Sequence, residues 1–127
     1  MRNILFRGKP KSELIDWIYG CYFWSELSGK HYIMGVSKDY GYTNIEVIPE
    51  TVGQYTGLTD KNGKEIFEGD ICYIQKWDCC THVCMRQGAW LLSFADCDEY
   101  LYDMAQECEV TGNIHDGPMK PLEAEDD

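Results

Sequence analysis

The chain has 127 residues, of which 44% are hydrophobic and 13% aromatic, and it carries a formal net charge of −11. This length suits one ordinary domain or two small subdomains, and the aromatic content excludes a disordered chain and favours β-strands. The charge is uneven, because residues 1–66 contain eight Lys/Arg and eight Asp/Glu, whereas residues 67–127 contain three and fourteen. An acidic second half repels a phosphate backbone, so nucleic acid is not an expected partner.

Membrane and secretory signals are not apparent. No apolar run approaches the roughly 20 residues that cross a bilayer, and the first residues, MRNILFRGKPKSEL, lack the apolar stretch of a secretory signal. We therefore expect a cytoplasmic protein with no membrane contact. The seven cysteines are an odd number, and in a reducing compartment we expect free thiols and no structural disulfide.

The first half of the chain predicts several strands. Residues 3–9, NILFRGK, form the first, which ends at Gly8 and Pro10. Residues 17–24 and 30–36 then form a hairpin that turns around Ser28-Gly29. Residues 37–43 are expected as a loop and residues 44–49 as a short strand that ends at Pro49.

Residues 51–58, TVGQYTGL, contain two glycines four positions apart. This spacing predicts one helical turn or an irregular turn that rests on the core. A phosphate-binding Walker loop requires Lys-Ser/Thr after its second glycine, but Gly57 is followed by Leu58 and Thr59. The stretch is therefore not a phosphate cradle.

Two further turn signals follow. Asn62-Gly63 predicts a hairpin with a type I′ turn, because both residues tolerate positive φ. Gly69-Asp70 precedes an apolar strand, and we expect the Asp70 carboxylate to accept hydrogen bonds from nearby backbone N–H groups. The alternative, Asp70 as a catalytic acid, lacks a partner acid or base spaced beside it.

Residues 78–107 raise the question of metal binding. DCCTHVCM contains ligand types that zinc prefers, in Cys79, Cys80, His82 and Cys84, but a second pair would have to combine Cys97 or Cys108 with a distant residue. The favoured interpretation is a strand, with Thr81, Val83 and Met85 on one face and His82 and Cys84 on the other. The acidic residues Asp96, Asp98, Glu99 and Asp103 lack the EF-hand pattern, so a solvated acidic face is favoured over a calcium site. Trp90–Phe94 is expected as a strand, followed by a helical turn at residues 100–104.

The stretches ETVGQYTGLTDKNGKEIFEGDI, FRGK with WIYG, and EVTGNIHDGP together resemble the YopX family, which occurs in bacteriophages and prophages. The resemblance is weakest over residues 76–100, and Thr111 stands where the family motif has an aliphatic residue. It implies a small SH3-like β-barrel in the C-terminal part, preceded by further β structure, and no assigned biochemical activity. No catalytic residues are carried over.

These observations predict a mainly β protein with minor α structure and three parts. Residues 1–50 form an N-terminal β region, residues 51–116 the SH3-like barrel with the segment that leads into it, and residues 117–127 a flexible acidic tail. The patterned residues are assigned to architecture, with the glycines supplying special backbone conformations and Gly112-Asn113 a bulge or bend. They are Gly53, Tyr55, Gly57, Asn62, Gly63, Gly69, Asp70, Gly112 and Asn113.

The leading functional hypothesis is a phage- or prophage-encoded accessory protein that binds a protein partner through an aromatic surface, without catalytic residues, metal or cofactor. Its partner is an unidentified host protein or a second copy of the chain. One alternative is an enzyme with a cleft between the two β regions, using Asp70, His31, His82 or His115 as acid or base. The other is an acidic mimic of nucleic acid. His115 and Asp116 are expected in a turn, because neighbours on a strand point to opposite faces.

Overall fold

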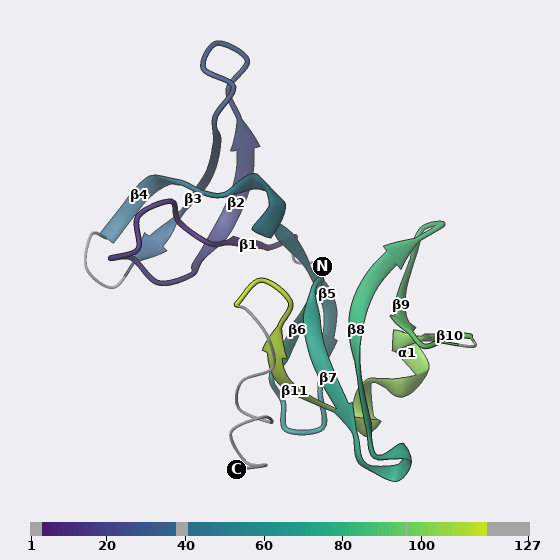
Figure 1. Ribbon diagram of the computed structural model, residues 1–127. Coiled ribbons are helices and arrows are strands. Elements are labelled where there is room, and N and C mark those ends of the chain that lie inside the picture. Colours follow the sequence, from purple (N-terminus) through teal and green to yellow (C-terminus); the bar gives the residue numbers. More distant parts are fainter. Residues whose placement is uncertain (1–3, 38–40, 96, 117–127) are drawn as a thin grey trace. The chain divides into compact units, whose positions relative to one another are not determined.

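The structure is a computed structural model that describes residues 4–37, 41–95 and 97–116. Over these residues it contains eleven β-strands and one short α-helix, so the expected mainly β class is confirmed (Figure 1). The chain forms two compact units, Met1–Tyr55 and Thr56–Asp127. The expected acidic tail, residues 117–127, lies outside the described residues.

The N-terminal unit is an antiparallel sheet in the order β4-β3-β2-β1-β5. Its strands are β1 (Phe6–Gly8), β2 (Ile18–Trp24), β3 (His31–Ser37), β4 (Gly41–Glu46) and the beginning of β5 (Gly53–Thr59), with a 3₁₀ turn at Pro49–Thr51. Alternating side chains of β2 and β3 fill a small core, because successive residues of a strand point to opposite faces. This core consists of Ile18, Ile33 and Val47, with Phe6, Tyr22, Ile45 and Val52 packed against it.

The hairpin of β2 and β3 is the longest feature of this unit and confirms the predicted pair of strands. Gly20 lies opposite Gly35 in the ladder. A Cβ atom on Gly20 would lie 2.1 Å from the carbonyl oxygen of Met34, so the two backbones approach too closely for any side chain there. The connecting loop closes with a hydrogen bond from the Ser25 N–H to the Lys30 carbonyl, and Gly29 has a positive φ of 71°.

The C-terminal unit contains a second antiparallel sheet, in the order β10-β9-β8-β7-β11. Its strands are β7 (Asp70–Ile74), β8 (Cys79–Arg86), β9 (Ala89–Ser93), β10 (Asp98–Tyr100) and β11 (Cys108–Asn113). The end of β5 continues into this unit, where β6 (Glu65–Phe67) is its neighbour. The core is lined by Ile66, Cys72, Ile74, Val83, Leu92, Leu101, Met104, Ala105, Cys108 and Val110.

Helical turns complete this unit. The segment η2 (Gln75–Trp77) follows β7, and α1 (Leu101–Met104) and η3 (Ala105–Glu107) connect β10 to β11. The predicted helical turn near residue 100 is thereby confirmed, because Leu101 and Met104 point into the core at helical spacing. The middle of β8 confirms the predicted alternation, since Thr81 and Val83 are buried and His82 is exposed, whereas Met85, expected on the face of Thr81 and Val83, is 40% exposed near the end of the strand.

The predicted barrel is not confirmed. Within the described residues the C-terminal sheet has two edges, β10 and β11, and no pair of strands closes it. The edge of β11 is instead contacted by the turn between β5 and β6, where the Lys61 N–H donates to the Cys108 carbonyl at 3.0 Å. Two antiparallel sheets are therefore the observed architecture.

Two local predictions were wrong. Residues 51–58 were expected as a helical or irregular turn, but residues 53–58 belong to β5, and the 3₁₀ turn lies earlier, at Pro49–Thr51. The two glycines misled the prediction, because Gly57 takes a positive φ of 86° inside a strand. The expected loop over residues 37–43 is also shorter, since β4 already begins at Gly41; residues 38–40 lie outside the described residues.

The turn at Asn62-Gly63 is present, but it is not type I′. Gly63 has a positive φ of 83°, whereas Asn62 does not. The Gly63 N–H donates to the Asp60 carbonyl at 3.0 Å, and the Asp60 N–H donates to the Lys64 carbonyl at 2.8 Å. This pattern is a type I turn followed by a left-handed glycine, the usual form of a three-residue hairpin loop.

Candidate functional site

Asp60 organises the turn between β5 and β6 and attaches it to β11. Its Oδ1 accepts hydrogen bonds from the backbone N–H groups of Asn62 at 2.8 Å and Lys64 at 2.9 Å. Its Oδ2 accepts a bond from the Val110 N–H at 2.9 Å, across 50 residues of sequence. The side chain is only 1% exposed. Asp60 therefore supplies a hydrogen-bond acceptor at the edge of β11, where no further strand of this sheet is paired among the described residues.

The charge of Asp60 is stabilised by these donors. Burial alone raises the pKa of its carboxyl, but hydrogen bonds from Val110, Lys64 and Asn62, together with the positive charge of Lys64, lower the pKa further than burial raises it. A carboxylate with a lowered pKa and three backbone donors is a poor general acid or base. We therefore assign Asp60 to architecture. Asp60 was not singled out from the sequence, although an Asp two residues before Asn-Gly is a recognisable signal for a turn closed by its side chain.

The Gly69-Asp70 pair forms the corner between β6 and β7. Gly69 has a positive φ of 90°, and its N–H donates to the Val83 carbonyl at 2.9 Å. The buried Asp70 accepts a hydrogen bond from the Phe67 N–H at 2.7 Å through Oδ2. The carboxylate thus bonds a backbone N–H three residues earlier, and this geometry supports an architectural role. His115 lies against this corner, with its Nε2 3.4 Å from the position of a Cβ on Gly69.

The remaining predicted motif residues lie in β5 and β11. Gly53 begins β5 opposite Arg7 of β1, and the Tyr55 N–H donates to the Leu5 carbonyl. Gly112 follows a break in register in β11, where Val110 pairs with Cys72 but Gly112 pairs with Ile71, so a bulge is present where one was predicted. The Asn113 side chain caps the turn after β11, because its Oδ1 accepts hydrogen bonds from the backbone N–H groups of His115 and Asp116.

The histidines proposed for an enzyme occupy separate elements. His31 begins β3, and its Nδ1 lies 2.7 Å from the hydroxyl oxygen of Tyr22. His82 is exposed on β8, opposite Ile71 and Ser93. His115 lies in the turn after β11, as predicted from its sequence neighbourhood.

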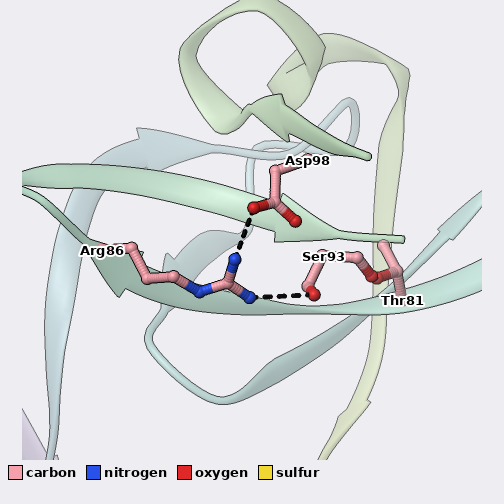
Figure 2. Close-up of polar contacts among 4 residues, drawn as sticks. All are labelled: Thr81, Arg86, Ser93 and Asp98. Carbon is pink, nitrogen blue, oxygen red and sulfur yellow. Dashed lines mark hydrogen bonds and ion pairs between the residues drawn. The ribbon is translucent and has the colours of Figure 1, made fainter. Parts of the chain in front are cut away.

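The acidic and cysteine-rich segment forms polar cross-strand contacts rather than a ligand cluster. Arg86 of β8 pairs with Asp98 of β10, and its second terminal nitrogen donates to Ser93 of β9 at 3.1 Å (Figure 2). The Thr81 hydroxyl donates to the Ser93 carbonyl. Asp96 of the suggested calcium site lies outside the described residues.

Over residues 4–37, 41–95 and 97–116, no group of three or more His, Cys, Asp or Glu side chains is placed to hold a metal ion. All seven cysteines are free thiols. Cys72 and Cys108 are fully buried on the neighbouring strands β7 and β11. The pKa of the Cys72 thiol is raised. The hydrogen bond between the two thiols is the larger cause, and the burial of Cys72 is the second.

The end of the β2–β3 hairpin concentrates exposed apolar side chains. β1 pairs with Ile18–Gly20, so the following residues of β2 have only β3 as a neighbouring strand among the described elements. The exposed fractions are 38% for Phe23, 54% for Trp24 and 101% for Leu27. Large exposed apolar groups gathered on one element mark an interaction site more often than isolated ones do.

Aromatic rings stabilise this end of the hairpin on both faces. Phe23 stacks on Tyr32 across the strands, with ring centroids 5.3 Å apart. On the opposite face Trp24 stacks on His31 at 6.3 Å. We call Phe23, Trp24, Leu27 and Tyr32, which cover both faces and the loop of this end of the hairpin, the hairpin surface. The alternation of aromatic residues predicted the strands, whereas the exposed Leu27 in the loop was not singled out.

These features define a mainly β protein of two antiparallel sheets, with buried carboxylates that fix turns and an exposed aromatic hairpin. The chain belongs to the YopX family: the family model described as YopX protein matches residues 7–120. Among curated proteins no match was found. Within the described part of the chain, no helix has the length and apolar character required to span a membrane.

Proposed function

We propose that this chain is a non-enzymatic protein-interaction module that docks through the hairpin surface. The observation that carries this proposal is the exposure of Phe23, Trp24 and Leu27 at the end of one hairpin. Trp and other aromatic side chains dominate binding energy when they enter a complementary pocket. Leu27 is fully exposed in the loop. A partner could therefore bury its apolar side chain without breaking any contact within this protein.

The partner that fits this surface is a protein with an apolar groove. The loop carries one acidic and one basic residue, Glu26 and Lys30, so its charge balances and selects no strongly charged surface. The stacking of Phe23 on Tyr32 preorganises the rings before binding, which reduces the entropy lost on association. A second copy of the chain is the alternative occupant.

Further expectations accompany this proposal. The family resemblance supports a phage or prophage gene and action in the cytoplasm of a bacterial host. A relation of the C-terminal unit to SH3-like barrels is supported by the turn at Asp60, which bonds to the edge of β11 through Val110 and Cys108. The phage origin, the location in the host and the relation to SH3-like barrels are independent of the hairpin surface.

The experiment compares partner capture by matched variants. Leu27→Asp places a charge on the hairpin surface, whereas Tyr102→Ser changes another highly exposed residue, 79% exposed, in α1. The proposal expects capture of the same host protein by wild type and Tyr102→Ser, and its loss with Leu27→Asp at unchanged thermal stability. Gel filtration of the purified chain tests the second-copy alternative, because Leu27→Asp would then convert a dimer to a monomer.

A further inference from the structure

Three segments that are distant in sequence meet at one end of the β7–β11 pair. Ile74 and Cys108 are partners in the ladder, so η2 leaves β7 at the same end at which η3 enters β11. The turn between β5 and β6 reaches the same place, because the Lys61 N–H donates to the Cys108 carbonyl at 3.0 Å. The Gln106 side chain donates to the Thr59 carbonyl at 3.3 Å and connects η3 to the end of β5.

These segments border an open hollow of about 370 Å³ at the surface, a volume at the lower end of the range of small-molecule sites. The residues that line it all end in polar or charged groups, and their aliphatic stems form part of its walls; they are Lys61, Gln75, Lys76, Gln106 and Glu107. All five belong to the C-terminal unit. The hollow is therefore defined independently of the N-terminal sheet and of the hairpin surface.

The two lysines carry charge that the protein itself does not neutralise. In the C-terminal unit the residues from 56 to 116 include four Lys and Arg, and two of these four line the hollow. Arg86 is already paired with Asp98. Over the described residues, neither Lys61 nor Lys76 is in an ion pair with a carboxylate, and the Lys76 ammonium lies 5.1 Å from the centre of the Trp77 ring. Two lysines without carboxylate partners at one hollow are unusual in a half of the chain that is strongly acidic.

We propose that this hollow binds the phosphate group of a small molecule. Lysine is a compact point charge that commonly binds phosphate, and two ammonium groups attract a phosphate of nearly two negative charges more strongly than a singly charged carboxylate. The Gln75 and Gln106 amides can donate further hydrogen bonds to phosphate oxygens. Glu107 opposes the anion, but the two lysines outweigh its single charge, so the net attraction increases with the charge of the anion.

The test is a titration of the ¹⁵N-labelled protein with inorganic phosphate at low ionic strength, followed by amide chemical shifts. We expect saturable shifts that cluster at residues 61, 75–76 and 106–107. Lys61→Gln combined with Lys76→Gln is expected to weaken binding at least about fivefold, since each lost charge removes a fraction of a kilocalorie to about 1 kcal/mol at the surface. Glu107→Gln is expected to strengthen it, and Lys64→Gln, an exposed lysine of the same turn outside the hollow, is expected to leave it unchanged.

A parallel titration with acetate distinguishes the ligand class. Preferential binding of phosphate supports the proposal, whereas equal or tighter binding of acetate overturns the assignment to phosphate. The proposal is also overturned by shifts that spread over all lysines, or by phosphate affinity that is the same in wild type and in the Lys61→Gln, Lys76→Gln double variant. The amide spectra of the variants report whether each remains folded, so a loss of binding is not confused with unfolding.

Discussion

The Oδ2 atom of Asp60 accepts a hydrogen bond from the backbone N–H of Val110 at 2.9 Å, and thereby joins two parts of the chain 50 residues apart. The same carboxylate bonds the N–H groups of Asn62 and Lys64. One buried side chain therefore shapes a turn and protects the edge of β11. This relationship explains why the most patterned stretch of the sequence can be architectural without any catalytic chemistry.

Asp60→Ala is expected to lower the free energy of unfolding by about 3 kcal/mol, because it leaves several backbone N–H groups without their acceptor, that of Val110 in a buried position. Chemical denaturation followed by far-UV circular dichroism measures this change. Asp103→Ala, at an exposed position of α1, is the control and should remain within about 0.5 kcal/mol of wild type. A loss smaller than that of the control would contradict the role given to Asp60.

The pH dependence of stability should carry the signature of Asp60. Its pKa in the folded protein lies below the ordinary value of 3.8, so the unfolded chain binds the proton first as the pH falls. The stabilisation is complete above the unfolded pKa, and it is lost as the pH falls through the folded pKa. Wild type should therefore lose more stability than Asp60→Asn on acidification below about pH 5. Parallel pH profiles for the two proteins would argue against this assignment.

The hairpin from β2 to β3 and the buried face of β8 could be predicted because their signals are local. Aromatic and β-branched residues alternate with period two in both, and the turn residues lie between the strands. Asp60 was not recognised because its most distant partner, Val110, is brought near only by the folded sheet. β5 was missed because it contains Gly57 with a positive φ. Glycine with such a backbone is typical of turns, so the sequence pattern did not indicate a strand.

Gly69 and Gly57 have similar positive φ angles, of 90° and 86°, and can be compared directly. Alanine at Gly57 meets open space, so its expected cost is the backbone strain of about 1 kcal/mol. Alanine at Gly69 adds a Cβ 3.4 Å from His115 Nε2, an ordinary van der Waals contact, so the same cost of about 1 kcal/mol is expected. Thermal melts of the two variants measure both losses. A clearly larger loss for Gly69→Ala would contradict the assignment of its cost to backbone conformation alone.

Thiol reactivity should separate the cysteines by burial. Cys21 and Cys97 are exposed, whereas Cys72 and Cys108 are fully buried, and the raised pKa of Cys72 disfavours its reactive thiolate. Alkylation with iodoacetamide, followed by mass spectrometry, should modify the first two rapidly. Cys72 and Cys108 should react only at the rate of unfolding. Rapid modification of either buried thiol in the folded protein would contradict the core of the C-terminal unit.

The most direct test of the proposed function is photo-crosslinking from the hairpin surface inside a bacterial host. A photoreactive benzoylphenylalanine replaces Leu27 in one sample and Tyr102, the exposed residue of α1, in the other. A partner that binds the hairpin surface should give a discrete covalent adduct from position 27 and none from position 102. No adduct from position 27, or the same adduct from both positions, would contradict docking through the β2–β3 hairpin.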